Sequence, residues 1–165
     1  MKIVSELPVH RQAVLELNRL AFKGDDESRL ITNLARENRI IASFVAVDGD
    51  EVIGHILFSP LHLVVDGKRI DAVALAPMCV GPSRQKQGIG TQLVGHGIEQ
   101  MKSAGQAAII VLGHVNFYPR FGFQHDLVRN LACSFNQYEA FMGLELRAGS
   151  LGGKPGMCTY PSAFD

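Results

Sequence analysis

The sequence contains only three cysteines, Cys79, Cys133 and Cys158, and no two of them form a C-x-x-C pair. It therefore indicates neither a zinc knuckle nor a disulfide framework, and reduced thiols in a cytosolic protein are the simplest interpretation. No apolar run approaches the ~20 residues that span a bilayer. The first residues, Met1–Glu6, also lack a signal-peptide pattern. We therefore expect a cytoplasmic protein that does not enter the membrane.

An excess of charge of either sign is absent too, because sixteen basic side chains balance sixteen acidic ones. A dedicated nucleic-acid-binding protein usually carries a basic face, so this balance argues against nucleic acid as a partner. What the sequence does have is 165 residues, of which 47% are hydrophobic. This is enough for one compact domain with a real core, and no linker or repeat divides it. We expect a single domain covering residues 1–165.

The first half of the chain changes its hydrophobic period near residue 40. Apolar residues recur at helical spacing after Pro8, and again after Asp25 or Asp26, which we expect to cap a second helix. Residues 40–80 are rich in β-branched residues and contain turn signals at Asp48-Gly49-Asp50 and Asp66-Gly67. They predict an antiparallel meander of three strands.

The second half begins with the clearest helix, Gly88–Ser103, followed by a short apolar strand at 107–112. The order strand, helix, strand is a βαβ unit, so the strand ending near residue 80 and the strand at 107–112 should be parallel. We further expect a short helix at 116–121 capped by Asn116, strands at 127–135 and 140–147, and coil at 149–161. The fold class is then α/β, with one mixed, mainly antiparallel sheet and helices on both faces.

The turn between Val80 and the long helix is the best functional signal. It contains Gly88 and Gly90 at the start of a helix, where backbone N–H groups lack partners, and Arg84 and Lys86 add positive charge. Such a turn suits a phosphate or diphosphate. A nucleotide P-loop does not fit, because both its spacing and its lysine are missing. A dinucleotide-binding fingerprint does not fit either, because Leu93 stands where the third glycine belongs.

The segment Gln85-Lys86-Gln87-Gly88-Ile89-Gly90 matches the pattern Q/R-x-x-G-x-G/A. This pattern resembles the acyl-CoA diphosphate loop of the GNAT superfamily of N-acetyltransferases. A second segment, Asn116-Phe117-Tyr118-Pro119-Arg120-Phe121-Gly122-Phe123, resembles the second signature of that superfamily. Together with the tail Tyr160–Phe164, it is similar to the YhbS-like branch of bacterial acetyltransferases. The resemblance covers nearly the whole chain.

The resemblance implies a GNAT fold, in which the two parallel central strands splay apart and the pantetheine arm of acetyl-CoA lies between them. Pro77, which cannot donate a hydrogen bond, lies inside the first of these strands. No metal is implied. The residues expected to bind the coenzyme are Met78, Cys79, Val80, Gln85, Lys86, Gln87, Gly88, Ile89, Gly90, Thr91 and Asn116.

The implied reaction is direct transfer of an acetyl group from acetyl-CoA to an amine, without a covalent enzyme intermediate. Tyr118 matches the tyrosine of the superfamily that protonates the departing thiolate, and a phenol with a pKa near ~10 suits that role. His114 and Asp71 are candidates for the general base, and His55 is a weaker one. We interpret the side chain of Cys79 as packing, because no histidine partner is evident.

The acceptor is left open between a small amine, an amino acid, an antibiotic and a protein amine. Asp25, Asp26 and Glu27 could attract a cationic acceptor by analogy with the superfamily, but we interpret them as helix-capping and helix-dipole charges. A non-catalytic acyl-CoA sensor is the alternative function. A transferase acting on aminoacyl-tRNA is a third, which the neutral charge disfavours. A homodimer is common in this fold and is a further expectation.

Overall fold

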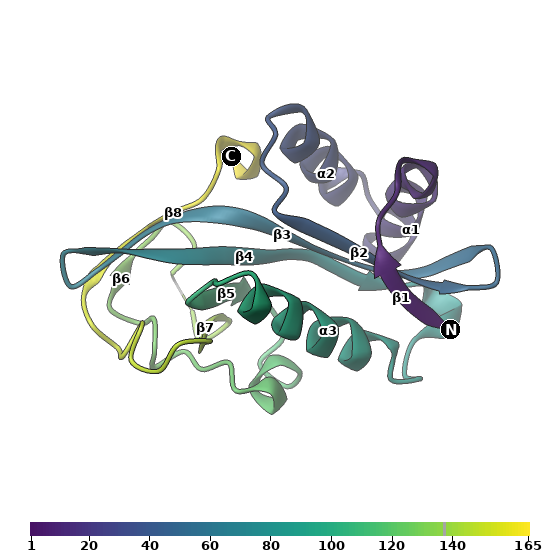
Figure 1. The fold of residues 1–165 in the computed structure, drawn as a ribbon. Coiled ribbons are helices and arrows are strands. Elements are labelled where there is room, and N and C mark those ends of the chain that lie inside the picture. Colours follow the sequence, from purple (N-terminus) through teal and green to yellow (C-terminus); the bar gives the residue numbers. More distant parts are fainter. Residues whose placement is uncertain (137) are drawn as a thin grey trace. The chain divides into compact units, whose positions relative to one another are not determined.

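The computed structural model describes residues 1–136 and 138–165. The chain forms two compact units. Unit 1 comprises Met1–Ser59, Ala76–Gly97 and Ser162–Asp165, and unit 2 comprises Pro60–Leu75 and Ile98–Pro161. β3 (Glu51–Val65) and β4 (Lys68–Val80) are the two long strands in Figure 1. Both contribute residues to each unit. In the part of the chain described, no helix has the length and apolar content needed to cross a membrane.

Unit 1 is built on antiparallel strands. β1 (Lys2–Ser5) pairs with β2 (Ala42–Asp48), and β2 pairs with the first part of β3. Because side chains alternate along a strand, His55 and Leu57 point to one face of β3, and Gly54 and Ile56 point to the other. These strands confirm the meander predicted for residues 40–80 as far as it lies in this unit.

Helices cover both faces of the unit 1 sheet (Figure 1). A short 3-10 turn, η1 (Pro8–His10), leads into α1 (Arg11–Phe22), and α2 (Asp26–Arg36) follows. Their buried side chains, including Val14 and Ile31, pack with Leu57 on one face. The first turns of α3 (Ile89–Ser103) lie against the other face, where the Gly97 α-carbon is so near the Phe58 ring that an added Cβ would be only 2.5 Å from it.

Unit 2 has β5 (Ala108–Leu112) at its centre, between two neighbours. On one side β5 runs parallel to β4, with Ala72 opposite Ala108 and Leu75 opposite Val111. On the other side it pairs antiparallel with β7 (Phe141–Glu145). The first four residues of β5 are buried and only the last, Leu112, is exposed, as expected for a strand covered on both faces. The predicted parallel pair of the βαβ unit is confirmed.

The strand predicted at 127–135 is mostly wrong. Only β6 (Leu131–Ala132) forms there, and the residues before it form tight turns. The Val128 N–H bonds the His125 carbonyl at 3.0 Å, and the Leu131 N–H bonds the Val128 carbonyl at 3.0 Å. Local turn hydrogen bonds therefore override the apolar content that favoured a strand. The second predicted strand, at 140–147, is confirmed as β7.

The coil predicted at 149–161 is also corrected, because β8 (Gly156–Thr159) forms within it. β8 pairs antiparallel with residues His62–Val65 of β3 and parallel with β6. A Cβ at Gly156 would lie 2.0 Å from the Val64 carbonyl oxygen, so the glycine that suggested coil is what permits this close pairing. A last 3-10 turn, η4 (Ser162–Phe164), belongs to unit 1.

Candidate active site

The turn that precedes α3 presents backbone N–H groups to solvent. β4 ends at Val80, a 3-10 turn η2 (Pro82–Arg84) follows, and residues 85–88 are all exposed. Lys86 and Gly88 have positive φ angles of 61° and 81°. The first α-helical bond runs from the Gln92 N–H to the Gly88 carbonyl at 3.1 Å. The N–H groups just before this bond have no place in the helical ladder, so they can receive an anion.

The charge beside this turn differs from the prediction. The guanidinium of Arg84 bonds the carboxylates of Asp48 at 3.1 Å and Glu51 at 2.7 Å, both at the β2–β3 turn. Its positive charge is therefore already compensated, and Arg84 instead ties the turn to the sheet. Lys86 forms no ion pair with any described residue, so it supplies the uncompensated positive charge. The acidic residues of the β2–β3 turn gave no signal of this contact in the sequence.

The end of β4 carries three of the residues expected to bind the coenzyme. The β4–β5 ladder ends at Leu75, two residues before Pro77, whose nitrogen cannot donate a hydrogen bond. Beyond it, Met78 and Val80 are half-buried and Cys79 is buried. Burial, together with the nearby charge of Glu27, raises the pKa of the Cys79 thiol to about 12. Cys79 therefore stays a protonated packing residue at neutral pH, in line with its interpretation from the sequence.

Tyr118, in unit 2, lies at the start of η3 (Tyr118–Phe121) with only 5% of its surface exposed. Its ring contacts the rings of Phe117 and Phe123 edge-on, with centroids 5.0 and 5.6 Å away. It also covers Gly113, where an added Cβ would lie 2.3 Å from the ring. Burial raises the pKa of Tyr118 to about 12, because it disfavours the phenolate. The ring is thus fixed and its hydroxyl stays protonated at neutral pH.

His114 and Asn116 precede Tyr118 on an exposed segment after β5. The His114 carbonyl accepts hydrogen bonds from the N–H groups of Phe117 at 3.1 Å and Tyr118 at 3.2 Å. These bonds close a tight turn that holds His114 near Tyr118. Asn116 was expected to cap the short helix, and this is corrected: Phe117 holds the cap position, and no side-chain cap is formed. The Asn116 carbonyl instead accepts a bond from Arg120 at 3.3 Å. The Asn116 side chain therefore does not cap this helix.

Asp71 is not brought together with His114. The Asp71 carbonyl accepts the N–H of Ala107 at 2.7 Å, which places Asp71 beside the amino end of β5. His114 follows the carboxyl end of the same strand. With a rise of about 3.3 Å per residue, seven residues of extended chain separate the two ends by roughly 20 Å. The two candidate bases therefore belong to opposite edges of unit 2.

His55 is enclosed in unit 1 by a chain of polar contacts. The Asn18 amide donates to its Nδ1 at 3.2 Å, so Nε2 carries the proton and donates to Ser43 Oγ at 2.9 Å. Ser43 donates to Glu6 at 2.5 Å, and Arg11 donates to the other Glu6 oxygen at 2.5 Å. Burial lowers the pKa of His55 to about 4. Both ring nitrogens are occupied and the ring is fully buried, so it is not available as a base.

The acidic residues between α1 and α2 do not form the expected side-chain cap. Asp25 holds the cap position of α2, but its carboxylate accepts a bond from Arg19 at 2.6 Å. Asp26 is bonded to Arg29 within the first turn. Asp26 and Glu27 do lie in the first turn of α2, where negative charge is favourable to the helix dipole.

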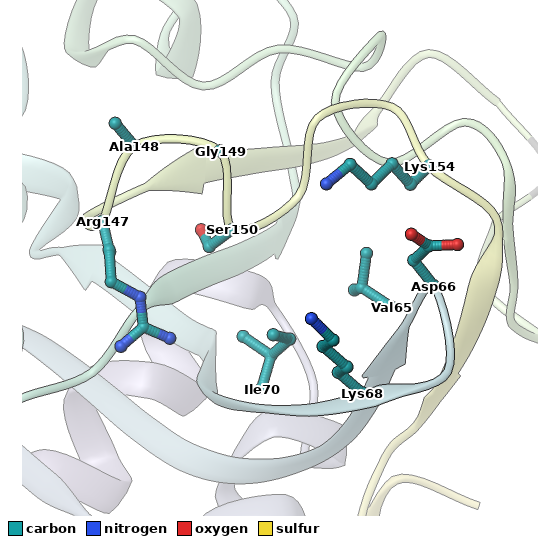
Figure 2. Close-up of a pocket in the computed structure, with 9 residues that line it drawn as sticks. All are labelled: Val65, Asp66, Lys68, Ile70, Arg147, Ala148, Gly149, Ser150 and Lys154. Atoms are coloured by element: carbon teal, nitrogen blue, oxygen red, sulfur yellow. The ribbon is translucent and has the colours of Figure 1, made fainter.

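Unit 2 also contains a pocket of about 230 Å³, which Figure 2 shows between the β3–β4 turn and the segment after β7. The side chains of Lys68, Arg147 and Lys154 surround it, together with the carboxylate of Asp66. None of the predicted site residues lines it, so it is distinct from the groups described above. Among residues 1–136 and 138–165, no cluster of three or more His, Cys, Asp or Glu residues is placed to hold a metal ion.

Comparison with known proteins identifies the class. Residues 9–125 match the family described as the acetyltransferase (GNAT) domain. The chain belongs to this family, and it is an N-acetyltransferase with a mixed α/β fold. The resemblance inferred from the two sequence signatures is thereby confirmed.

Particular relatives resemble the chain over its whole length. It is 32% identical over 167 residues to the uncharacterized N-acetyltransferase YhbS of Escherichia coli strain K12, covering 100% of this chain and 99% of the relative. A crystal structure of Escherichia coli YhbS in complex with CoA matches it with a TM-score of 0.90 and 31% identity, covering 99% of this chain and 91% of that one. A Brucella melitensis GNAT acetyltransferase in complex with acetyl-CoA matches with a TM-score of 0.82 and 27% identity, over 99% and 97% of the two chains.

Proposed function

We propose that this chain transfers an acetyl group from acetyl-CoA to an amine by direct attack within a ternary complex. The observation that carries the proposal is the exposed turn at 85–88, whose N–H groups precede the helical ladder of α3 and suit a diphosphate. The CoA bound to YhbS and the acetyl-CoA bound to the Brucella protein support the choice of ligand.

The coenzyme is held mainly by backbone groups in this proposal. The amides of pantetheine bond the backbone of Met78, Cys79 and Val80, and the side chain of Asn116 adds a polar contact. The diphosphate bonds N–H groups of Gln85, Lys86, Gln87, Gly88, Ile89, Gly90 and Thr91. The ammonium of Lys86, which no described carboxylate compensates, adds an attraction that salt should weaken.

The chemistry then requires one proton to leave the amine and another to reach the thiolate. An alkyl amine with a pKa near ~10.4 is mostly protonated at pH 7, so a base must remove its proton. We assign this to His114, because Asp71, the other candidate base, lies at the far end of β5 from Tyr118, and a strand N–H at Met78 or Cys79 stabilises the oxyanion. As the new C–N bond forms and the C–S bond breaks, Tyr118 donates its proton to the sulfur. Burial raises the pKa of Tyr118, and it also raises that of a thiolate bound in the same apolar surroundings.

Calorimetric titration with acetyl-CoA tests the binding step. Gly88→Ala adds a Cβ that meets no atom within 4 Å, but it strains a backbone with a φ of 81° and shifts the N–H groups of the turn. We expect its Kd for acetyl-CoA to rise about tenfold, equivalent to about 1.4 kcal/mol. Gly105→Ala is the matched control, since Gly105 has a φ of 82° and equally open surroundings after the other end of α3. An equal loss of affinity in both variants would refute the role of the turn.

Release of free thiol across a panel of amines tests catalysis and identifies the acceptor class. We expect thiol release that depends on one class of amine, whether a small amine, an amino acid, an antibiotic or a protein amine. Coenzyme binding without thiol release from any amine would contradict transferase activity and favour the acyl-CoA sensor. Transfer that depends on aminoacyl-tRNA would favour that alternative instead. The cytoplasmic location and the homodimer stay predictions, and light scattering of the purified chain checks the second.

A further inference from the structure

Two of the three cysteines, Cys133 and Cys158, lie next to each other in unit 2. The strands β6 and β8 run parallel, with Leu131 opposite Gly156 and Ala132 opposite Met157. Continuing this register by one residue beyond the end of β6 brings Cys133 opposite Cys158. Neighbouring strands are about 4.8 Å apart, which falls within the ~4.4–6.8 Å between α-carbons that a disulfide requires. Residues opposite each other point to the same face, and Cys133 packs against the buried cluster that contains Cys158.

The surroundings of the Cys133 sulfur favour its thiolate form. The Cys158 thiol and the backbone N–H groups of Phe135 and Asn136 lie around it, and the Asn136 N–H bonds the Cys133 carbonyl at 3.1 Å. The Asn136 side chain fixes this turn by donating to the carbonyls of Val128, Arg129 and Leu131 at 3.1, 3.1 and 2.7 Å. The neighbouring Cys158 thiol and then the nearby backbone N–H groups lower the pKa of Cys133 to about 6, while Cys133, together with burial, raises the pKa of Cys158.

The two thiols also differ in access, as a reactive and a resolving cysteine must. Cys133 is half-buried, so a small oxidant can reach it from solvent. Cys158 is only 3% exposed, so an oxidant in solvent does not reach it directly. Cys79, the third cysteine, is buried in unit 1, and its pKa is raised to about 12, so it shares neither property.

We propose that Cys133 and Cys158 form a redox site that a hydroperoxide converts into an intramolecular disulfide. The Cys133 thiolate attacks a peroxide oxygen, the O–O bond breaks, and the departing oxygen takes a proton and leaves as water or an alcohol. This gives a sulfenic acid on Cys133. Cys158 then loses its thiol proton and attacks the Cys133 sulfur, so that the S–S bond forms, the S–O bond breaks and water leaves. With hydrogen peroxide, two thiols and one peroxide become one disulfide and two waters.

Mass spectrometry of the whole chain after treatment with hydrogen peroxide tests the site. We expect the loss of two hydrogen atoms and a peptide bridged between Cys133 and Cys158, with Cys79 unmodified in the same molecule as the internal control. Cys158→Ser should stop the reaction at the sulfenic acid, which dimedone traps on Cys133. Cys133→Ser should form neither product. A bridge between two chains, or oxidation of Cys133 no faster than of Cys79, would overturn the proposal.

The rate of alkylation by iodoacetamide gives a second measurement that does not require oxidation. In the native chain, modification of Cys133 should reach half its maximal rate near pH 6. In Cys158→Ala, which removes the thiol donor, the midpoint should move towards the ordinary value of 9.0 for cysteine. An unchanged midpoint in this variant, with the native circular dichroism spectrum retained, would show that the two sulfurs do not interact and would refute the site.

Discussion

At the scale of single residues, packing holds the aromatic ring of Tyr118 in place. Gly113 leaves room for its ring, and Phe117 and Phe123 hold it edge-on. A phenol fixed in this way can donate its proton in one direction without first paying the entropy of ordering the ring. The residue signature that drew attention to Tyr118 thus coincides with a rigid, protonated hydroxyl.

Tyr118→Phe removes this hydroxyl and leaves the ring contacts in place. If Tyr118 is the general acid, kcat should fall about 100-fold or more, with little change in the affinity for acetyl-CoA. Tyr138→Phe is the control, because Tyr138 is 73% exposed in unit 2 and has no part in the proposed reaction. Steady-state thiol release measures both variants. A Tyr118→Phe enzyme with the native kcat would remove this residue from the mechanism.

The burial of His55 predicts a dependence of stability on pH. Its pKa is about 4 in the folded chain, against an ordinary value of 6.5, so below pH 6.5 the unfolded chain binds the extra proton first. The contribution of the neutral His55 to the free energy of unfolding is therefore fully present above pH 6.5. It is lost as the pH drops towards 4, and the loss is about 3 kcal/mol in total. Urea unfolding at several pH values measures this slope. His55→Gln, which cannot titrate, should flatten it relative to the native chain between pH 6.5 and 4, and an identical slope would contradict the assignment.

At the scale of elements, the close packing of α3 on β3 depends on Gly97 and does not depend on Gly95. A Cβ at Gly97 would meet the Phe58 ring at 2.5 Å, whereas a Cβ at Gly95 meets no atom within 4 Å. Gly97→Ala should therefore cost about 1–3 kcal/mol through overpacking. Gly95→Ala, in the same helix, should stabilise the fold by about 0.5–1 kcal/mol, because alanine loses less backbone entropy. Urea unfolding of both variants checks the prediction, and equal effects would disprove the close contact.

The sequence was sufficient for elements whose signal is local. The helix α3 and the turn before it could be predicted because a helical apolar stripe, a glycine turn and a flanking strand coincide, and β3 and β4 because turn residues separate them. β8 could not, since it forms by pairing with β3, and the glycine and proline content of residues 149–161 indicates coil when read alone. The same limit applies to the site: the turn at 85–88 was predictable, but the ion pairs that Arg84 makes with Asp48 and Glu51 depend on folding of residues 33 and 36 positions away.

At the scale of the whole molecule, the two units share the strands β3 and β4. β3 supplies residues up to Ser59 to unit 1 and residues from Pro60 to unit 2, and β4 is divided between Leu75 and Ala76. The strands themselves run without interruption through both divisions. If one unit unfolded alone, parts of β3 and β4 would lose their strand partners, and unpaired backbone groups destabilise the fold. This continuity is the reason to keep the prediction of one cooperative domain over residues 1–165.

Scanning calorimetry tests this last expectation. A single domain gives one transition whose van't Hoff enthalpy equals the calorimetric enthalpy, whereas two independent units give two transitions or a ratio well below one. One destabilising variant in each unit makes the test sharper. Gly97→Ala lies in unit 1, and Gly143→Ala lies in unit 2, where an added Cβ would be 2.5 Å from Val128. Each variant should lower the midpoint of the same single transition. If each lowered only one of two resolved transitions, the two units would be separate folding domains, because destabilisation would then not pass along β3 and β4.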